Sequence, residues 1–172
     1  MTHVNPGRPN DGEYVPYYGT YIRLVPDGDL ITILERQIDA MVADLSTFTA
    51  EQAAWRPAPG EWNATEIVGH LADSERVFAY RALWFARDAP APLPGMDQEA
   101  FMAAVDFARR PLPDVVDEFA AVRCASLALL RSLDAAAWTR GGVADGNPIS
   151  VRALGYIMAG HALHHAKDFG SG

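Results

Sequence analysis

The sequence is poor in cysteine, in lysine and in long apolar runs. Cys124 is the single cysteine among 172 residues, so neither an intramolecular disulfide nor a cysteine-rich zinc site can form. Lys167 is the single lysine, and 22 acidic against 14 basic residues give a net charge of −8. Proteins that neutralise nucleic-acid phosphates need clustered basic residues. The composition therefore argues against binding to nucleic acid and to anionic membrane surfaces.

No apolar run reaches the roughly 18 residues of a transmembrane helix. The first residues also lack the apolar core of a secretory signal. We therefore expect a cytoplasmic protein that does not associate with membranes. A hydrophobic fraction of 49% over this length indicates one globular domain with a sizeable core.

Residues 1–28 differ in composition from the rest of the chain. They are rich in proline, glycine, asparagine and aspartate and show no sustained periodicity, but their second half contains four tyrosines. A wholly disordered segment rarely holds so many aromatic residues. We predict a mobile tail over residues 1–12. An extended arm over residues 13–26 is expected to pack on the body or on a partner chain.

Residues 29–170 form the predicted domain, because apolar residues recur there at helical spacing between good capping residues. No segment shows a convincing strand alternation, and residues 141–146 are interpreted as a glycine-rich loop. The pattern predicts an all-α fold, an antiparallel four-helix bundle with short extra helices. The main helices are expected over residues 29–46, 64–87, 113–133 and 150–169, and a short one over residues 97–108.

Four of the five histidines lie on the predicted second and last helices. At about 100° per residue, His161 and His165 fall on the buried stripe of the last helix, and His164 lies nearer its edge. His70 lies on the inner face of the second helix. Neutral imidazole is a common ligand for zinc and related metals, and three protein ligands with an open position are typical of catalytic sites. The alternative is a set of ordinary core histidines with hydrogen-bond partners.

Two known metal patterns are absent. Residue 162 is alanine, so the last helix lacks the His-Glu-x-x-His motif of zincins. That helix also offers no glutamate for a di-iron centre. A mononuclear site is therefore favoured over a dinuclear one.

Two motifs combine these histidines with flanking residues. One is Trp62-Asn63-x-x-Glu66-x-x-x-His70-Leu71-x-Asp73-x-Glu75, and the other is His161-x-x-His164-His165. Together with the helix order over residues 29–169, they resemble the DinB/YfiT-like superfamily of metal-dependent enzymes. The resemblance implies a four-helix bundle, often a homodimer, with one divalent metal per chain.

The resemblance also implies roles for particular residues. Carried over by position, the metal ligands are His70, His161 and His165, and His164 takes an accessory position beside the last ligand. Zinc or nickel is the expected metal, with iron or manganese as further options because imidazole suits all of them. Residues 1–28 lie outside the resemblance.

Members of this superfamily transfer low-molecular-weight thiols such as bacillithiol or mycothiol, or isomerise substrates with their help. The resemblance thus implies a metal-dependent enzyme acting on a small molecule, by thiol-dependent S-transferase-like chemistry with a thiol cosubstrate or as a hydrolase. The alternative is a non-catalytic, stress-associated helical bundle that serves dimerisation or binding. The sequence shows no obvious catalytic base, so the catalytic residues are not assigned.

Other polar residues near the expected site are candidates for supporting or lining it. Arg81 either binds an acidic substrate group or forms a surface ion pair. The carboxylates either orient a ligand imidazole or have local roles, Glu66 in a helix cap and Asp168 in an exposed pair. The full set of candidates is Asn63, Glu66, Asp73, Arg81, His164 and Asp168.

Overall fold

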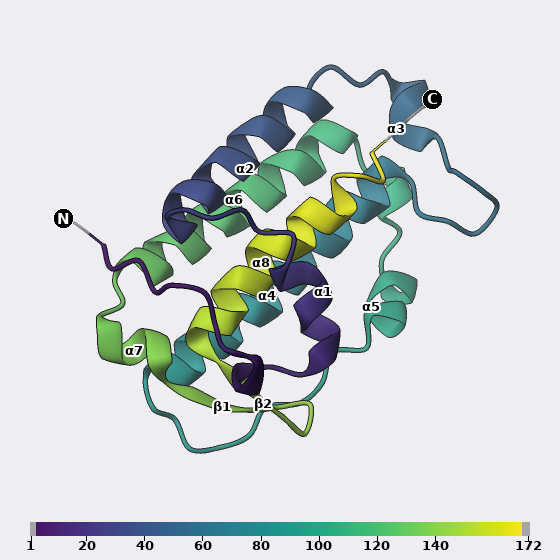
Figure 1. Ribbon diagram of the computed structural model, residues 1–172. Coiled ribbons are helices and arrows are strands. Elements are labelled where there is room, and N and C mark those ends of the chain that lie inside the picture. The colour runs from purple at the N-terminus through teal and green to yellow at the C-terminus, as the bar shows by residue number, and fades with distance from the viewer. Residues whose placement is uncertain (1–2, 170–172) are drawn as a thin grey trace.

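The computed structural model describes residues 3–169 of the chain and confirms the predicted four-helix bundle. The four long helices pack side by side (Figure 1). Within the described residues, no helix is both long and apolar enough to cross a membrane. The bundle consists of α2 (Leu30–Leu45), α4 (Ala64–Ala86), α6 (Leu112–Arg131) and α8 (Val151–His165).

The helices begin where the sequence predicts. Asp29 caps α2, and Ser150 caps α8, each through its side-chain oxygen. Thr49 opens the short helix α3 (Ala50–Ala54), and Asn63 with Glu66 forms a complete capping box at the start of α4. These caps satisfy backbone N–H groups that the first turn of a helix leaves without partners.

The directions of the helices follow from two clusters of core residues. One cluster packs the beginnings of α2 and α8 against the ends of α4 and α6. The other packs the end of α2 against the beginnings of α4 and α6. The predicted antiparallel packing therefore holds for the pairs α2 with α6 and α4 with α8. The neighbours α4 and α6, in contrast, run in the same direction.

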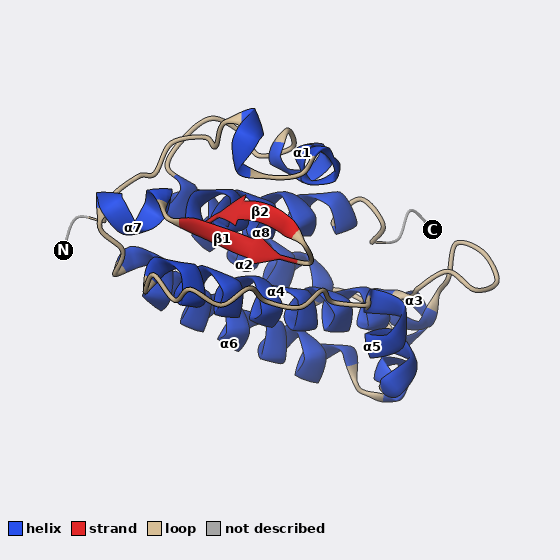
Figure 2. Cartoon of the chain, turned by 90° about the horizontal axis from the view of Figure 1, so that it is seen from below, coloured by secondary structure: helices blue, strands red, loops and turns tan. Residues whose placement is uncertain are grey.

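The connection between α4 and α6 allows this parallel pair, because it returns along the bundle before α6 begins (Figure 2). It contains α5 (Gln98–Ala104) and the 3₁₀ helix η3 (Phe107–Arg109), where the sequence predicts one helix up to residue 108. Phe107 packs so closely on Gly69 in the first half of α4 that a β-carbon at Gly69 would collide with its ring. The connection thus ends beside the start of α4.

A β-hairpin stands where the sequence predicts a glycine-rich loop. β1 (Gly141–Ala144) and β2 (Asn147–Ser150) pair antiparallel and follow the short helix α7 (Ala135–Thr139). Asp145 and Gly146 form the turn with φ of 56° and 72°, a backbone for which Asp-Gly is favoured. The prediction of no strand was wrong, because four-residue strands that contain glycine and proline show no clear alternation.

The N-terminal arm packs on the body as predicted, but it is not extended. Its residues form the 3₁₀ helices η1 (Asp11–Glu13) and η2 (Pro16–Tyr18) and the single helical turn α1 (Gly19–Ile22). α1 lies against α8 (Figure 1). The backbone carbonyl of Tyr21 approaches Gly160 so closely that no other residue would fit there without a shift.

The predicted mobile tail over residues 1–12 was wrong for residues 3–12, because their side chains bind other parts of the chain. His3 contacts the carboxylate of Asp29 at 2.9 Å. Arg8 donates to the carbonyls of Ile22 and Val25, both at 2.8 Å. Residues 1–2 lie outside the described residues, as does Gly170, the predicted end of the domain.

Glu13 fixes the arm at the start of α8. It accepts hydrogen bonds from the hydroxyl of Ser150 at 2.6 Å and from Nε of Arg152 at 2.7 Å. These bonds lower the pKa of Glu13 to about 2. α8 itself ends at His165, four residues earlier than predicted.

Candidate metal centre

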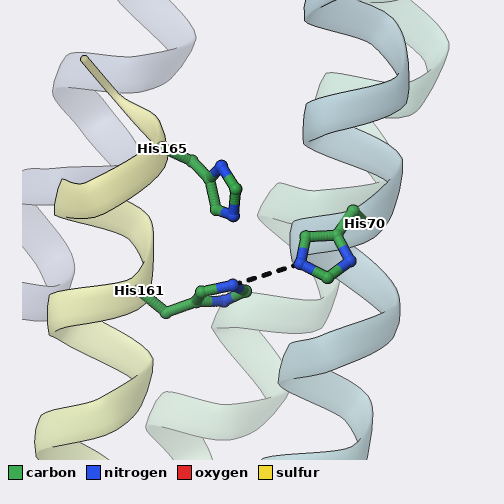
Figure 3. Close-up of side chains that lie close together, drawn as sticks. All are labelled: His70, His161 and His165. Carbon is green, nitrogen blue, oxygen red and sulfur yellow. Dashed lines mark hydrogen bonds between the residues drawn. The ribbon is translucent and has the colours of Figure 1, made fainter. Parts of the chain in front are cut away.

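Three histidines from two helices converge between α4 and α8 (Figure 3). His70 belongs to α4, and His161 and His165 lie one turn apart on α8. Each ring offers one nitrogen, and these nitrogens all lie within 4.8 Å of one another. The Nε2 atoms of His70 and His161 are 3.1 Å apart. His70 and His161 are buried, and His165 is half-buried.

Burial keeps these imidazoles uncharged. It lowers the pKa of His70 to about 4, with a further contribution from neighbouring His165. It also lowers the pKa of His161, well below its ordinary value, and that of His165. At neutral pH each ring therefore carries one N–H and one lone pair, the form in which imidazole binds metals.

The three nitrogens form a group that could hold a divalent metal ion. Two nitrogens on one tetrahedral zinc lie about 3.3 Å apart, since each Zn–N bond is about 2.05 Å long. The 3.1 Å between His70 and His161 is close to this separation. Nδ1 of His165 lies 3.1 Å from the Asp168 carboxylate, so its N–H can donate there and leave the lone pair on Nε2. Asp168 is thus the one acidic candidate that the structure places on a histidine of the cluster.

Aromatic rings surround the cluster. The ring centre of Trp62 lies 4.8 Å from that of His70, and the ring centre of Tyr21 lies 5.2 Å from that of His161. His164 is exposed, its ring centre lies 5.3 Å from that of Tyr21, and it is not one of the three converging histidines. These contacts give the histidines a largely apolar surrounding.

Three other candidates have local roles. Asn63 and Glu66 bind each other's backbone N–H groups at the start of α4, and Glu66 also pairs with Arg56. Asp73 pairs with Arg76 one turn later on the same helix at 3.1 Å. Capping accounts for Asn63 and Glu66, as the alternative interpretation of Glu66 proposed, and a surface ion pair accounts for Asp73.

A cavity of about 400 Å³ opens beside the cluster. α4 and α8 contribute His70, His161 and Arg81 to its wall, and the hairpin contributes residues 144–149 except Gly146. The arm adds Tyr17, Tyr18 and Tyr21, so it covers a cavity of its own chain. His165 and Trp62 line a second cavity, of about 370 Å³.

Two buried charges, Glu75 and Arg123, were not among the predicted site residues. Arg123 on α6 is fully buried and binds Glu75 on α4 through both Nε and Nη2, each at 2.7 Å. Its Nη1 donates to the carbonyl of Leu34 on α2 at 3.1 Å. An arginine within the apolar face of α6, and a glutamate among the buried positions of α4, were the signals for this pair.

Comparison with known protein families identifies the family of this chain. The profile of the DinB superfamily matches residues 33–168. The chain belongs to the DinB superfamily. The resemblance seen in the two histidine motifs is thus confirmed. No curated protein matches the sequence.

Two solved structures share the fold of this DinB-superfamily protein. YfiT from Bacillus subtilis, described as a probable metal-dependent hydrolase with an unusual four-helix bundle topology, is 17% identical with a TM-score of 0.67. That match covers 95% of this chain and 89% of YfiT. A mycothiol-dependent maleylpyruvate isomerase is 13% identical with a TM-score of 0.69, over 87% of this chain but only 62% of the isomerase. At such identities the likeness shows the fold alone.

Proposed function

We propose that this protein is a metalloenzyme that acts on a small molecule, with His70, His161 and His165 as ligands of one divalent ion. The observation that carries the proposal is the convergence of three neutral imidazoles within 4.8 Å, with His70 and His161 also lining the cavity. Core histidines in a purely structural role need a partner for every ring N–H and lone pair. A metal ion would use three lone pairs at once.

A bound divalent ion would supply Lewis acidity, which makes a thiol or a water molecule nucleophilic at neutral pH. The surrounding residues prepare the site. Asp168 fixes which nitrogen of His165 is free, and the rings of Trp62 and Tyr21 pack against the buried His70 and His161. Electrostatic interactions in such a shielded site are stronger than in water.

Two reactions suit this arrangement, the transfer of a low-molecular-weight thiol to an electrophile and hydrolysis. We place the thiol reaction first, because one structure of the same fold is a mycothiol-dependent isomerase. The likeness to YfiT, a probable metal-dependent hydrolase, supports the second reaction. Zinc and nickel are the first metals to test, followed by iron and manganese. A homodimer and a cytoplasmic location stay predictions.

The first test is elemental analysis of untagged protein, because a polyhistidine tag would itself bind metal. We expect about one equivalent of metal in the wild type, in line with a mononuclear three-ligand site. His161→Ala should lose the metal. His164→Ala is the matched control, since it removes an imidazole from the same helix but outside the cluster, and it should keep the metal.

The second test separates the reactions. Transfer of mycothiol or bacillithiol to monochlorobimane should require both the thiol and the metal, whereas hydrolysis of model esters should require the metal alone. Equal rates with metal-free protein would reject both reactions. If no metal binds after reconstitution with zinc and nickel, and neither metal raises the melting temperature, the metalloenzyme proposal is wrong. The non-catalytic binding bundle would then be favoured.

A further inference from the structure

Arg81 occupies an unusual position on α4. It follows His70 by three helical turns, so both side chains lie on the same face, about 16 Å apart along the helix axis. Its exposed fraction is only 4%, and it lines the same cavity of about 400 Å³ as His70 and His161. The sequence left open whether Arg81 binds an acidic group or forms a surface ion pair, and its burial excludes the second.

The guanidinium of Arg81 lacks a carboxylate partner within residues 3–169. Its Nη2 donates to the carbonyl of Pro94 at 2.8 Å, but no ion pair within 4.0 Å includes it. Asp145 lines the same cavity from the hairpin turn without pairing to it. A buried cation without a partner anion is costly, and an anionic ligand would relieve that cost.

The wall next to Arg81 suits the body of an organic molecule. The hydroxyls of Tyr17 and Tyr21 are 2.9 Å apart and hydrogen-bonded, and the ring of Tyr18 meets Phe78 edge-on at 6.3 Å. Burial raises the pKa of Tyr18, and the charge of nearby Arg81 opposes this. The cavity therefore combines one cation, aromatic surfaces and tyrosine hydroxyl groups.

We propose that the substrate is a small organic carboxylate, with its acid group bound by Arg81 and its body covered by the tyrosines of the arm. Arginine suits this role, because its planar fork binds a carboxylate through two parallel hydrogen bonds. The inference rests on the proposed function for the reaction at the histidine end. The carboxylate subsite itself does not depend on the metal.

The test is a calorimetric binding titration of the full-length protein, as purified and again after chelation of metal. The probes are straight-chain carboxylates from propionate to octanoate together with 3-phenylpropionate, each compared with its neutral amide. At least one acid should bind saturably and at least tenfold more tightly than its amide, in both protein preparations. Arg81→Gln should weaken that acid at least tenfold, whereas Arg81→Lys should retain part of the affinity.

Arg87→Gln is the matched control, because it removes the same charge from an exposed position at the end of α4. It should leave the affinity unchanged. Since Arg81→Gln alters a buried residue, circular dichroism checks its fold, and the acid-against-amide comparison in the wild type stands without any variant. Absence of saturable binding for every acid, equal affinity for acid and amide, or an equal loss in Arg87→Gln would overturn the proposal. Binding that persists without metal separates this subsite from the metal site.

Discussion

Two groups of polar side chains that pack on α4 are built in opposite ways, one between α4 and α6 and the other between α4 and α8. Glu75 and Arg123 carry opposite charges, and every nitrogen of the guanidinium has an acceptor within the chain. The three histidines bring like groups together edge-on, and each of them lines a cavity. Arg81 resembles the histidines in this respect, because its hydrogen-bond partners within residues 3–169, the carbonyl of Pro94 and the hydroxyl of Tyr18, carry no opposite charge.

Polar groups that the fold itself explains thus differ from polar groups for which we propose a ligand. Buried polar groups nearly always have hydrogen-bond partners. In a buried pair of opposite charge, each group is the partner of the other. The histidines carry no opposite charges, and the hydrogen bond within the cluster joins Nε2 of His70 to Nε2 of His161. The Glu75–Arg123 pair should therefore govern stability, and the histidines and Arg81 should govern binding.

The largest expected effect is on the paired group. Arg123→Met leaves the Glu75 carboxylate buried without its partner, which should lower the free energy of unfolding by about 3–5 kcal/mol. Urea denaturation followed by circular dichroism measures this. The double variant with Glu75→Leu should recover most of the loss, because no charge is then buried. A loss below about 1 kcal/mol in the single variant would contradict the comparison.

The next effect concerns the histidine cluster. Zinc at about 1,000 times its dissociation constant should raise the free energy of unfolding of the wild type by about 4 kcal/mol. A chelator should reverse the gain. His161→Ala should show no such rise, because it lacks one of the three converging nitrogens. Equal stabilisation of both proteins would mean that zinc binds elsewhere.

A smaller effect is expected at Asp168, whose carboxylate accepts a hydrogen bond from the ring of His165. Asp168→Ala removes the acceptor of the His165 N–H and should weaken zinc binding about 10–100-fold. Competition with a chromophoric chelator measures the affinity. Asp73→Ala is the control, because that carboxylate pairs with Arg76 and not with a histidine. Similar affinities of the two variants would remove Asp168 from the site.

The smallest effect is on the arm and depends on pH. The folded-state pKa of Glu13 is depressed from 4.5 to about 2, so its ionised form stabilises the fold above pH 4.5. This contribution should be lost as the pH falls from 4.5 towards 2. Glu13→Gln should therefore lower the melting temperature at pH 7 by about 2–4 °C, the equivalent of ~1 kcal/mol. The difference from the wild type should shrink in acid, and a constant difference across pH would contradict this role.

The features that local rules control could be predicted from the sequence. The caps at Asp29, Thr49, Asn63 and Ser150 depend on side chains within three residues of the helix start, and all four are present. The inner faces of the second and last helices depend on spacing alone. That is why three histidines could be placed near one another before their distances were known.

The features that depend on distant partners could not be predicted. The parallel direction of α4 and α6 depends on the path of residues 87–111 between them. The conformation of the arm depends on contacts with Arg152 and Gly160, which lie far away in the sequence. Arg123 has no local signal for its partner, since Glu75 lies on another helix. The hairpin differs from these cases, because Asp145-Gly146 is a short-range signal that was available and was interpreted as a loop.

The wall of the cavity comes from two parts of the chain, the bundle with its hairpin and the arm that lies on α8. The family profile begins at residue 33, yet three tyrosines of the cavity wall come before it. The histidines lie on the long helices α4 and α8. The arm supplies part of the cavity wall and is bound to the body by its own contacts, such as those of Glu13. The chain is thus modular in a way that suits directed evolution. Libraries confined to residues 13–22 would reshape the pocket and leave the histidine-bearing helices untouched.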